Sequence, residues 1–364
     1  MTAHSETVVI AMSGGVDSSV AAALLVEQGY NVVGMMLRLW SEPGTEAENR
    51  CCTPDSMALA RKIASTLKIP FYAIDSREIF YQTVVAGFLK DYANGLTPNP
   101  CVTCNRQIRW GYLLEQALAI GGNFLATGHY ARVSRAEHGK FQLLRGIDPM
   151  KDQSYVLHVL DQHQLSHSMF PLGNLTKPET RELARKFDLP VADKTDSQDL
   201  CFLGAGDYQH FLLRNAPEVA RPGDIVNSRG EVLGGHEGLA FYTIGQRKGI
   251  KIAGPEPLYV IAKDLANNTL QVGTEDELGC LSAYIRYVNW IDGMAPTEPF
   301  FAKVKIRYRA AFTSAFVLPE GADGAILQFE KPVRDLTPGQ AAVFYNGDIV
   351  LGGGMIMDIV AQEH

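Results

Sequence analysis

The chain has 364 residues, of which 46% are hydrophobic and 20% are charged, and its formal net charge is -7. This composition excludes disordered and fibrous proteins, and the length predicts two or three domains rather than a single core. The acidic total also excludes a protein that coats nucleic acid non-specifically, because such binding needs many cations. Any nucleic-acid partner must therefore meet a local basic patch.

The N-terminal residues 1–6 are polar and lead directly into an apolar run, so we expect no secretory signal there. No apolar stretch approaches the roughly 18 residues that would cross a bilayer. We therefore expect a cytoplasmic protein with no membrane partner. Six cysteines in that compartment favour metal binding or catalysis over a disulfide framework.

From Thr7 to about Val133, short apolar runs alternate with amphipathic stretches, which is typical of a parallel sheet covered by helices. The expected strands are residues 7–12, 31–39, 71–75 and 123–128. The expected helices are residues 18–29, 54–67 with Thr53 as N-cap, 77–92 and 108–120. The pattern predicts a doubly wound α/β domain, in which ligands bind beyond the carboxyl ends of the strands.

Beyond Lys151 the pattern changes. Mixed helices are expected near residues 165, 179–187 and 207–215, followed after Pro222 by Gly-rich short strands. From about Tyr284, repeated short strands continue to residues 351–360. The sequence thus predicts a catalytic domain at 1–205, a small central domain at 206–278 and a C-terminal β-barrel at 279–364.

The first strand runs into a Ser-Gly-Gly-Val-Asp-Ser-Ser turn at 13–19 and then into an apolar helix. The glycines let the backbone approach an anion closely, the unpaired amides of the first helical turn point at it, and the serine hydroxyls add donors. Asp17 fits an anion cradle if it holds Mg²⁺ that bridges phosphates. The turn has neither a Walker nor a dinucleotide motif. The alternative, a tight turn with a serine cap, does not explain the serine cluster with Asp17.

This turn resembles the phosphate loop of the N-type ATP pyrophosphatases, which cleave ATP between the α and β phosphates and adenylate a carbonyl oxygen. That superfamily includes synthetases with amine nucleophiles as well as tRNA-thiolating enzymes. The resemblance therefore implies ATP and leaves the substrate open.

Two cysteines lie in polar segments that could present a reactive thiol. Cys104 follows a Thr-Pro-Asn-Pro sequence at 97–100, which predicts a rigid, exposed loop, and Cys201 lies in a second polar loop. Arg106 and Arg109 are close enough in sequence to favour a thiolate at Cys104. The alternatives are half of a structural zinc site for Cys104 and a small core residue for Cys201.

Six motifs in chain order make the resemblance specific. They are Ser-Gly-Gly-Val-Asp-Ser at 13–18, Thr-Pro-Asn-Pro-x-x-x-Cys-Asn at 97–105, Thr-Gly-His-Tyr at 127–130, Lys-Asp-Gln-Ser-Tyr at 151–155, Asp-Ser-Gln-Asp-x-Cys-Phe at 196–202 and Tyr-Thr-Ile-Gly-Gln-Arg-Lys-Gly at 242–249. Together they resemble the bacterial tRNA-specific 2-thiouridylases over nearly the whole chain. The resemblance implies an adenine nucleotide alpha hydrolase-like fold and ATP-dependent 2-thiolation of the wobble uridine, position 34, of tRNAs for lysine, glutamate and glutamine.

The resemblance also implies roles for individual residues. The ATP site would consist of Ala11, Met12, Ser13, Gly14, Gly15, Val16, Asp17, Ser18, Leu37 and Gly128. Cys104 would be the nucleophile, and Cys201 would carry a persulfide sulfur supplied by a cysteine desulfurase or a sulfur-relay protein. The tRNA contacts would be Asn99, Pro100, Cys101, Lys151, Asp152, Gln153, Arg307 and Tyr308. Many family members have Asp where this chain has Cys101, so the role of that residue is open.

An alternative keeps the reaction and changes the sulfur chemistry. Cys101, Cys104 and Cys201 would supply three soft ligands, enough for an iron-sulfur cluster with one open iron. Such a cluster would replace the persulfide relay, because the same thiolates cannot serve both purposes. Two further hypotheses are a synthetase of the same superfamily with an amine nucleophile, which needs neither cysteine, and a non-catalytic, metal-stabilised RNA-binding protein.

Cations alternate with apolar residues in the segment 301–309, at Lys303, Lys305, Arg307 and Arg309. On a strand, this spacing places four positive charges on one face and the packing side chains on the other. Four like charges in line repel one another, so a polyanion such as tRNA is the expected partner. The alternative is an ordinary solvated strand face.

Overall fold

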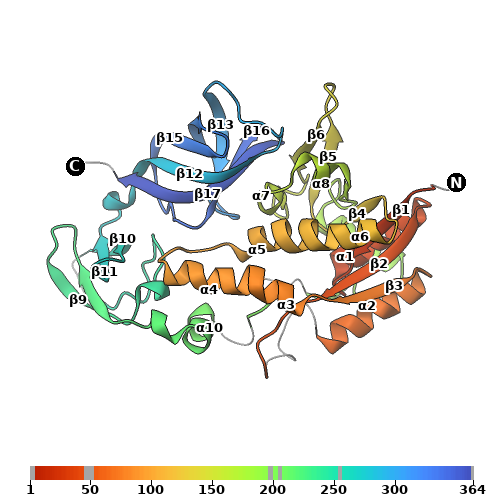
Figure 1. The fold of residues 1–364 in the computed structure, drawn as a ribbon, viewed down its shortest axis with the longest axis horizontal. Helices are drawn as coiled ribbons and strands as arrows, with labels where there is room; N and C mark the ends of the chain where they lie inside the picture. Colours follow the sequence, from red (N-terminus) through yellow and green to blue (C-terminus); the bar gives the residue numbers. More distant parts are fainter. Residues whose placement is uncertain (1–4, 45–52, 196–199, 204–206, 253–255, 362–364) are drawn as a thin grey trace.

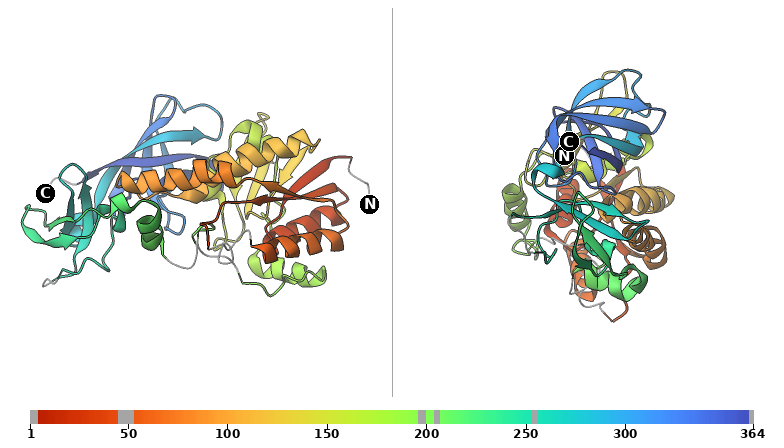
Figure 2. Two further views of the ribbon diagram at one scale, coloured as in Figure 1. Left: turned by 60° about the horizontal axis from the view of Figure 1, so that its bottom comes forward. Right: turned by 90° about the vertical axis from the view of Figure 1, so that its left-hand side faces the viewer.

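Three β structures follow one another along the chain: a parallel sheet, a small central sheet and a C-terminal barrel (Figure 1). The computed structural model describes residues 5–44, 53–195, 200–203, 207–252 and 256–361. The molecule is elongated, with the central sheet at the opposite end from the N-terminus (Figure 2).

The parallel sheet has five strands in the order β3-β2-β1-β4-β7. They are β1 (Thr7–Ala11), β2 (Asn31–Arg38), β3 (Phe71–Asp75), β4 (Phe124–Ala126) and β7 (Ser168–Met169). Since β1 pairs in parallel with β2 on one side and β4 on the other, the carboxyl ends of these strands lie at one edge. The strand order reverses at β1, which confirms the predicted doubly wound fold.

Helices cover both faces of this sheet, because successive strand residues point into different cores. On one face, Val8 and Ile10 pack with α1 (Val16–Glu27), α2 (Pro54–Thr66) and α9 (Lys177–Lys186). On the other face, Val9 packs with α6 (Leu114–Ala119) and with the barrel strand that carries Tyr345. Within the described residues, no helix has both the length and the apolar character to span a membrane.

Two long helical runs lie side by side in the middle of the molecule (Figure 1). The first consists of α3 (Arg77–Phe80), a π-helical stretch (Tyr81–Val85) and α4 (Ala86–Ala93), as predicted for 77–92. The second consists of α5 (Pro100–Thr103), a π-helical stretch (Cys104–Leu113) and α6. The predicted loop at 97–105 is therefore wrong from Pro100 onward, where the chain is helical. Asn99 caps this run by accepting the Cys101 amide at 3.2 Å, and Pro100 is its first residue.

The remaining helices are short. α7 (Ser154–Leu157) and α8 (Gln162–Ser166) precede β7, and α10 (Tyr208–Asn215) precedes the central sheet. Single 3₁₀ turns occupy Pro217–Val219, Leu239–Phe241 and Asp276–Leu278. The helices predicted near 165, 179–187 and 207–215 correspond to α8, α9 and α10.

The central sheet has the order β10-β11-β8-β9. Its strands are β8 (Gly223–Val226), β9 (Val232–His236), β10 (Tyr259–Asp264) and β11 (Thr269–Gly273). Val260 and Leu270 of this sheet share a core with Phe211 of α10 and Phe88 of α4. The central part therefore rests on the first helical run.

Six antiparallel strands close into the barrel, because β12 pairs with both β15 and β17. They are β12 (Cys280–Trp290), β13 (Phe300–Lys305), β14 (Thr313–Glu320), β15 (Gly324–Val333), β16 (Ala341–Asn346) and β17 (Ile349–Ala361). A hairpin of β5 (Ala131–Arg135) and β6 (Phe141–Arg145) extends the same sheet, with Leu144 opposite Ile349. The predicted barrel is confirmed, and its sheet also takes two strands from the first part of the chain.

Candidate functional site

The turn between β1 and α1 has the geometry of an anion cradle. Gly14 has φ 68°, and a Cβ there would lie 2.6 Å from the carbonyl oxygen of Ser56, so only glycine fits. Ser18 Oγ lies 3.2 Å from the Ser13 amide nitrogen and 3.2 Å from Ser13 Oγ. The phosphate loop, residues 13–18, is thus shaped by its own side chains and by α2.

The other residues predicted to bind nucleotide lie beside the phosphate loop. Leu37 is the last residue but one of β2, and Gly128 follows the end of β4. A Cβ on Gly128 would lie 2.7 Å from the Ser18 amide nitrogen and 2.8 Å from the Asp17 carbonyl carbon. The two segments therefore meet backbone to backbone, and the structure brings the predicted ATP residues to one edge of the sheet.

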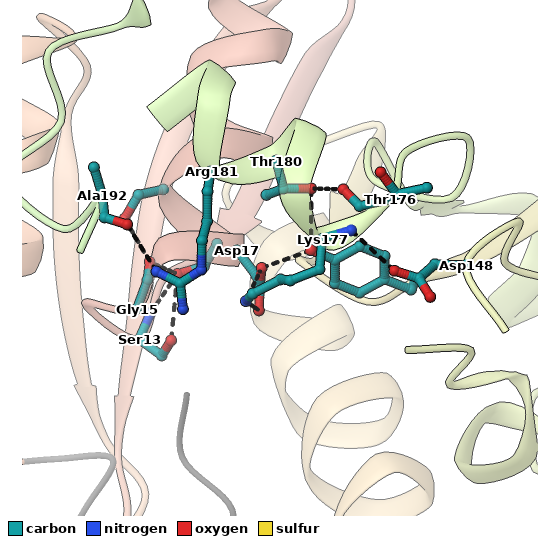
Figure 3. Close-up of polar contacts among 12 residues, drawn as sticks. Ser13, Gly15, Asp17, Asp148, Thr176, Lys177, Thr180, Arg181 and Ala192 are labelled. Atoms are coloured by element: carbon teal, nitrogen blue, oxygen red, sulfur yellow. Dashed lines mark hydrogen bonds and ion pairs between the residues drawn. The ribbon is translucent and has the colours of Figure 1, made fainter. Parts of the chain in front are cut away.

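A lysine that the sequence-based prediction did not include faces the phosphate loop. Lys177 Nζ lies 2.8 and 2.9 Å from the two carboxylate oxygens of Asp17, and its side chain is only 10% exposed (Figure 3). Tyr130 Oη donates to the same carboxylate at 2.8 Å. Asp17, predicted to hold Mg²⁺, thus holds an ammonium group. The available signal was the capping box of Thr176 and Glu179, which marks a helix start at Lys177.

The Lys-Asp-Gln motif, residues 151–153, supports the phosphate loop indirectly, through a residue that contacts it. Gln153 Oε1 accepts the Tyr130 amide at 3.0 Å and so fixes the residue whose phenol binds Asp17. Asp152 is buried, accepts two backbone amides and lies 3.2 Å from Arg145 Nε. The Asp152 carboxylate is therefore not exposed for the predicted contact with tRNA.

A cavity of about 710 Å³ opens beside Lys177. Its lining includes Lys151, Arg181, Arg185 and two carboxylates. Lys151, which the resemblance assigns to tRNA, therefore borders the same cavity as the lysine that faces the phosphate loop.

A buried histidine supports the loop that follows β4. Burial, with a smaller effect of the nearby Arg109 cation, lowers the pKa of His129 well below its usual range. Arg109 Nη1 lies 3.4 Å from Nε2, and Nδ1 lies 2.7 Å from Thr127 Oγ1, so the neutral ring accepts from arginine and donates to threonine. His129 thus holds the Gly128 backbone in place and exchanges no proton near neutral pH.

The cysteine segment, residues 97–104, lies where the three parts of the molecule meet. Cys104 is buried in the core beneath α4 and the central sheet. Cys201 is half-buried and packs against the same core, while Cys101 is exposed. The structure thus brings Cys104 and Cys201 to one core. The prediction of an exposed Cys104 is wrong, because this residue belongs to a helix and not to a loop.

The iron-sulfur hypothesis requires three cysteines at one point. In the part of the chain that the structure describes, no three His, Cys, Asp or Glu side chains come together as metal ligands. Residues 196–199 of the Cys201 motif lie outside the described residues. Cys101, Cys104 and Cys201 therefore do not form a three-cysteine ligand set among the described residues.

Some of the residues predicted to touch tRNA lie within the cysteine segment or follow the barrel strand β13. Asn99 caps the helical run, and Cys101 is exposed on its first turn. Burial, followed by the negative charge of Asp152, raises the pKa of Tyr308 to about 12. The Arg309 cation lowers the pKa of Tyr308 by a smaller amount.

The prediction of four exposed cations in line is wrong. β13 ends at Lys305, whose side chain is only 9% exposed and lies 3.9 Å from Asp152. Arg307 follows the strand and donates through Nη2 to two backbone carbonyls and a threonine hydroxyl. Of the four cations, Lys303 and Arg309 are exposed. Alternation along one strand cannot reveal which other segment covers its face.

Three family models match consecutive parts of the chain. A model described as tRNA methyl transferase HUP domain matches residues 6–205. A tRNA methyl transferase PRC-barrel domain matches 209–274, and an aminomethyltransferase beta-barrel domain matches 282–356.

Similar sequences occur in several bacteria. The tRNA-specific 2-thiouridylase MnmA of Magnetococcus marinus is 48% identical over 97% of this chain and 99% of its own. That of Geobacter metallireducens is 46% identical over 96% of each chain. Among solved structures, a 4-thiouridine synthetase–RNA complex with bound ATP is 14% identical, with a TM-score of 0.37 over 58% of this chain and 51% of that chain.

Proposed function

Since the chain belongs to the tRNA-specific 2-thiouridylase family, we propose that it uses ATP to replace the C2 oxygen of a tRNA uridine by sulfur. The observation that supports this best is the presence, in one chain, of a shaped phosphate loop and two cysteines at one core. The proposed substrate is the wobble uridine, position 34, of tRNAs for lysine, glutamate and glutamine.

The first half-reaction activates the base. The amides of the phosphate loop would bind the ATP phosphates. The Lys177 ammonium would turn from Asp17 to the phosphates, which would leave the Asp17 carboxylate as the candidate ligand for Mg²⁺. The uridine C2 oxygen attacks the α-phosphate and pyrophosphate leaves. This step is needed because oxide is a very poor leaving group, whereas AMP is a good one. Fixed positive groups at the loop stabilise the charge that develops on pyrophosphate.

The second half-reaction delivers sulfur. A cysteine desulfurase or a relay protein would load Cys201 as a persulfide, whose terminal sulfur attacks C2 while AMP leaves. The Cys104 thiolate then attacks the Cys201 sulfur and breaks the sulfur–sulfur bond. The base keeps the sulfur, Cys104 and Cys201 form a disulfide, and a thiol reductant restores both cysteines.

The target base must leave its stack to reach this site. Extrusion from an anticodon loop costs only a few kcal/mol, because such bases are already poorly stacked. Asn99, Pro100 and Cys101 with Tyr308 would face the extruded base, and Lys151 would contact the tRNA backbone.

The substitution Cys201→Ala tests the sulfur step. The wild type should release pyrophosphate in a tRNA-dependent manner and form 2-thiouridine, detected by mass spectrometry of digested tRNA. The variant should still bind ATP and form no 2-thiouridine. Cys280→Ala, in the barrel core, is the control and should thiolate like the wild type.

Each other outcome has a distinct meaning. If Cys201→Ala still forms 2-thiouridine, Cys201 is not the persulfide carrier. If the wild type releases no pyrophosphate in a tRNA-dependent manner, the proposed function itself is contradicted. Activity that survives thiol alkylation would favour an amine-using synthetase. Activity that tracks iron in anaerobically purified protein would favour the cluster hypothesis.

A further inference from the structure

We propose that the C-terminal barrel takes part in sulfur transfer, because its barrel loop, residues 335–340 between β15 and β16, positions the cysteine segment through Gln340. The inference rests on the proposed function in that Cys104 is taken as the nucleophile. It gives the barrel a role beyond that of a surface for RNA.

Both backbone polar groups of Thr97 bind the barrel loop. The Thr97 amide donates to the carbonyl oxygen of Pro338 at 2.9 Å. In return, Gln340 Nε2 donates to the carbonyl oxygen of Thr97 at 2.8 Å and lies 3.4 Å from that of Pro98. The start of the cysteine segment is thus held by one backbone and one side-chain hydrogen bond to the barrel loop.

The barrel loop approaches the segment too closely for a side chain. Gly339 has φ 92°, and a Cβ there would lie 2.8 Å from the Thr97 amide nitrogen and 2.9 Å from Leu96 Cβ. The Gly339 amide donates to Ile356 of β17 at 2.8 Å, and the Ile356 amide donates to Gln340 at 2.8 Å. The loop is therefore fixed to the barrel wall and forms a rigid support.

A displacement of Thr97 would be passed on to Cys104. Pro98 and Pro100 fix their own φ angles and restrict the residues before them. Asn99 then caps the helix that continues through Cys104. Few backbone dihedral angles between Thr97 and the thiol can change without breaking the cap or the helix.

The central part is attached to the same loop from another side. Arg307 Nη2 donates to the Ile244 carbonyl oxygen at 3.1 Å and to the Asp335 carbonyl oxygen at 2.8 Å, and it also contacts Thr337 Oγ1. The barrel loop thus joins the central part, the barrel wall and the cysteine segment. Its position decides where Cys104 lies relative to the core that Cys201 contacts.

The test removes the amide donor of Gln340. Gln340→Leu removes the hydrogen bond, and Gln340→Glu removes it while keeping the shape of the side chain. The control is Gln162→Leu, because Gln162 Nε2 also donates to two carbonyls, those of Phe141 at 2.8 Å and Ile291 at 2.6 Å. Gln162 likewise joins the first part to the barrel region but binds no residue of the cysteine segment.

We expect both Gln340 variants to thiolate tRNA about tenfold more slowly at saturating substrate, since small misplacements of reacting groups carry large rate penalties. The KM for tRNA should rise as well, because Asn99, Pro100 and Cys101, which would face the extruded base, belong to the displaced segment. Alkylation of Cys104 by iodoacetamide, followed by mass spectrometry, should be about fivefold faster, because a buried thiol becomes accessible when its support loosens. Gln162→Leu should match the wild type in both measurements.

Unchanged Cys104 alkylation in both Gln340 variants would overturn the proposal, and so would equal changes in Gln162→Leu. Thermal melting identifies a variant that does not fold, in which case the other Gln340 substitution decides. If the wild type itself forms no 2-thiouridine, the proposed function fails, and the alkylation contrast still decides whether the barrel positions Cys104.

Discussion

The phosphate loop and the cysteine segment are built in opposite ways. In the phosphate loop, Ser13 and Ser18 hydrogen-bond each other across five positions of the chain. In the cysteine segment, Thr97 is held by Gln340, 243 positions away. The turn of the phosphate loop is therefore stabilised by neighbouring residues, whereas the thiol site depends on the assembly of all three parts. Single substitutions should distinguish the two.

The largest effect should come from Gly14→Ala in the phosphate loop. A left-handed conformation costs a non-glycine residue about 1–2 kcal/mol, and the clash with Ser56 adds about 1–3 kcal/mol. We expect the free energy of unfolding to fall by about 3 kcal/mol and ATP affinity to be lost, measured by urea unfolding and calorimetry.

Gly15→Ala is the matched control. Gly15 has φ -97°, and a Cβ there meets only the flexible Ser13 Oγ at 3.3 Å. Its cost in unfolding free energy should be about 1 kcal/mol or less. Equal losses of unfolding free energy in the two variants would show that the left-handed conformation of Gly14 and its contact with Ser56 do not constrain the loop.

A smaller effect is expected from Lys177→Met. This substitution removes the ammonium group that contacts the phosphate loop from a position 160 residues away in the sequence. The rate of tRNA-dependent pyrophosphate release should fall about thirtyfold, or about 2 kcal/mol in activation free energy, because a fixed cation near the leaving group is lost. Lys186→Met is the control, since Lys186 lies on the same helix and pairs with Glu27 on the surface at 2.9 Å. If the variant loses thermal stability but releases pyrophosphate at an unchanged rate, the role of Lys177 is purely structural.

The smallest expected effect is a loss of folding stability in acid, which arises from a buried histidine. His158 lies between α7 and β17, and burial lowers its pKa to about 4. As the pH falls below the unfolded-state pKa of 6.5, the unfolded chain takes up a proton that the folded protein refuses, so stability is lost. Between pH 7 and 5.5 the wild type should lose about 1 kcal/mol relative to His158→Gln. A pH-independent difference in unfolding free energy would contradict this.

The sequence predicted well those features that neighbouring residues decide. The short apolar run around Val8, Val9 and Ile10 predicted a strand of a parallel sheet covered by helices, and the Thr53–Pro54 pair predicted the start of α2. Asn99–Pro100 is the same signal, an N-cap followed by proline. Two prolines in a polar stretch usually indicate a loop, and this second signal outweighs the N-cap signal when the sequence alone is considered.

Other features could not be predicted because they arise from contacts between distant residues. Lys177 meets Asp17 only after α9 packs on α1. Lys305 has the strand spacing of an exposed cation, yet Asp152 and the hairpin region cover it. No local pattern distinguishes such a lysine from a solvated one.

The hairpin that joins the barrel sheet has a consequence for how the protein is made. β6 ends at Arg145 and its partner β17 begins at Ile349, roughly 200 residues later. At about 5–20 residues per second, a ribosome needs about 10–40 s to supply that partner. During this interval Leu144, which pairs with Ile349 in the folded protein, lacks its partner, and this end of β6 can join with other unfinished chains. The yield of the enzyme in cells should therefore depend on chaperone supply more than its equilibrium stability suggests.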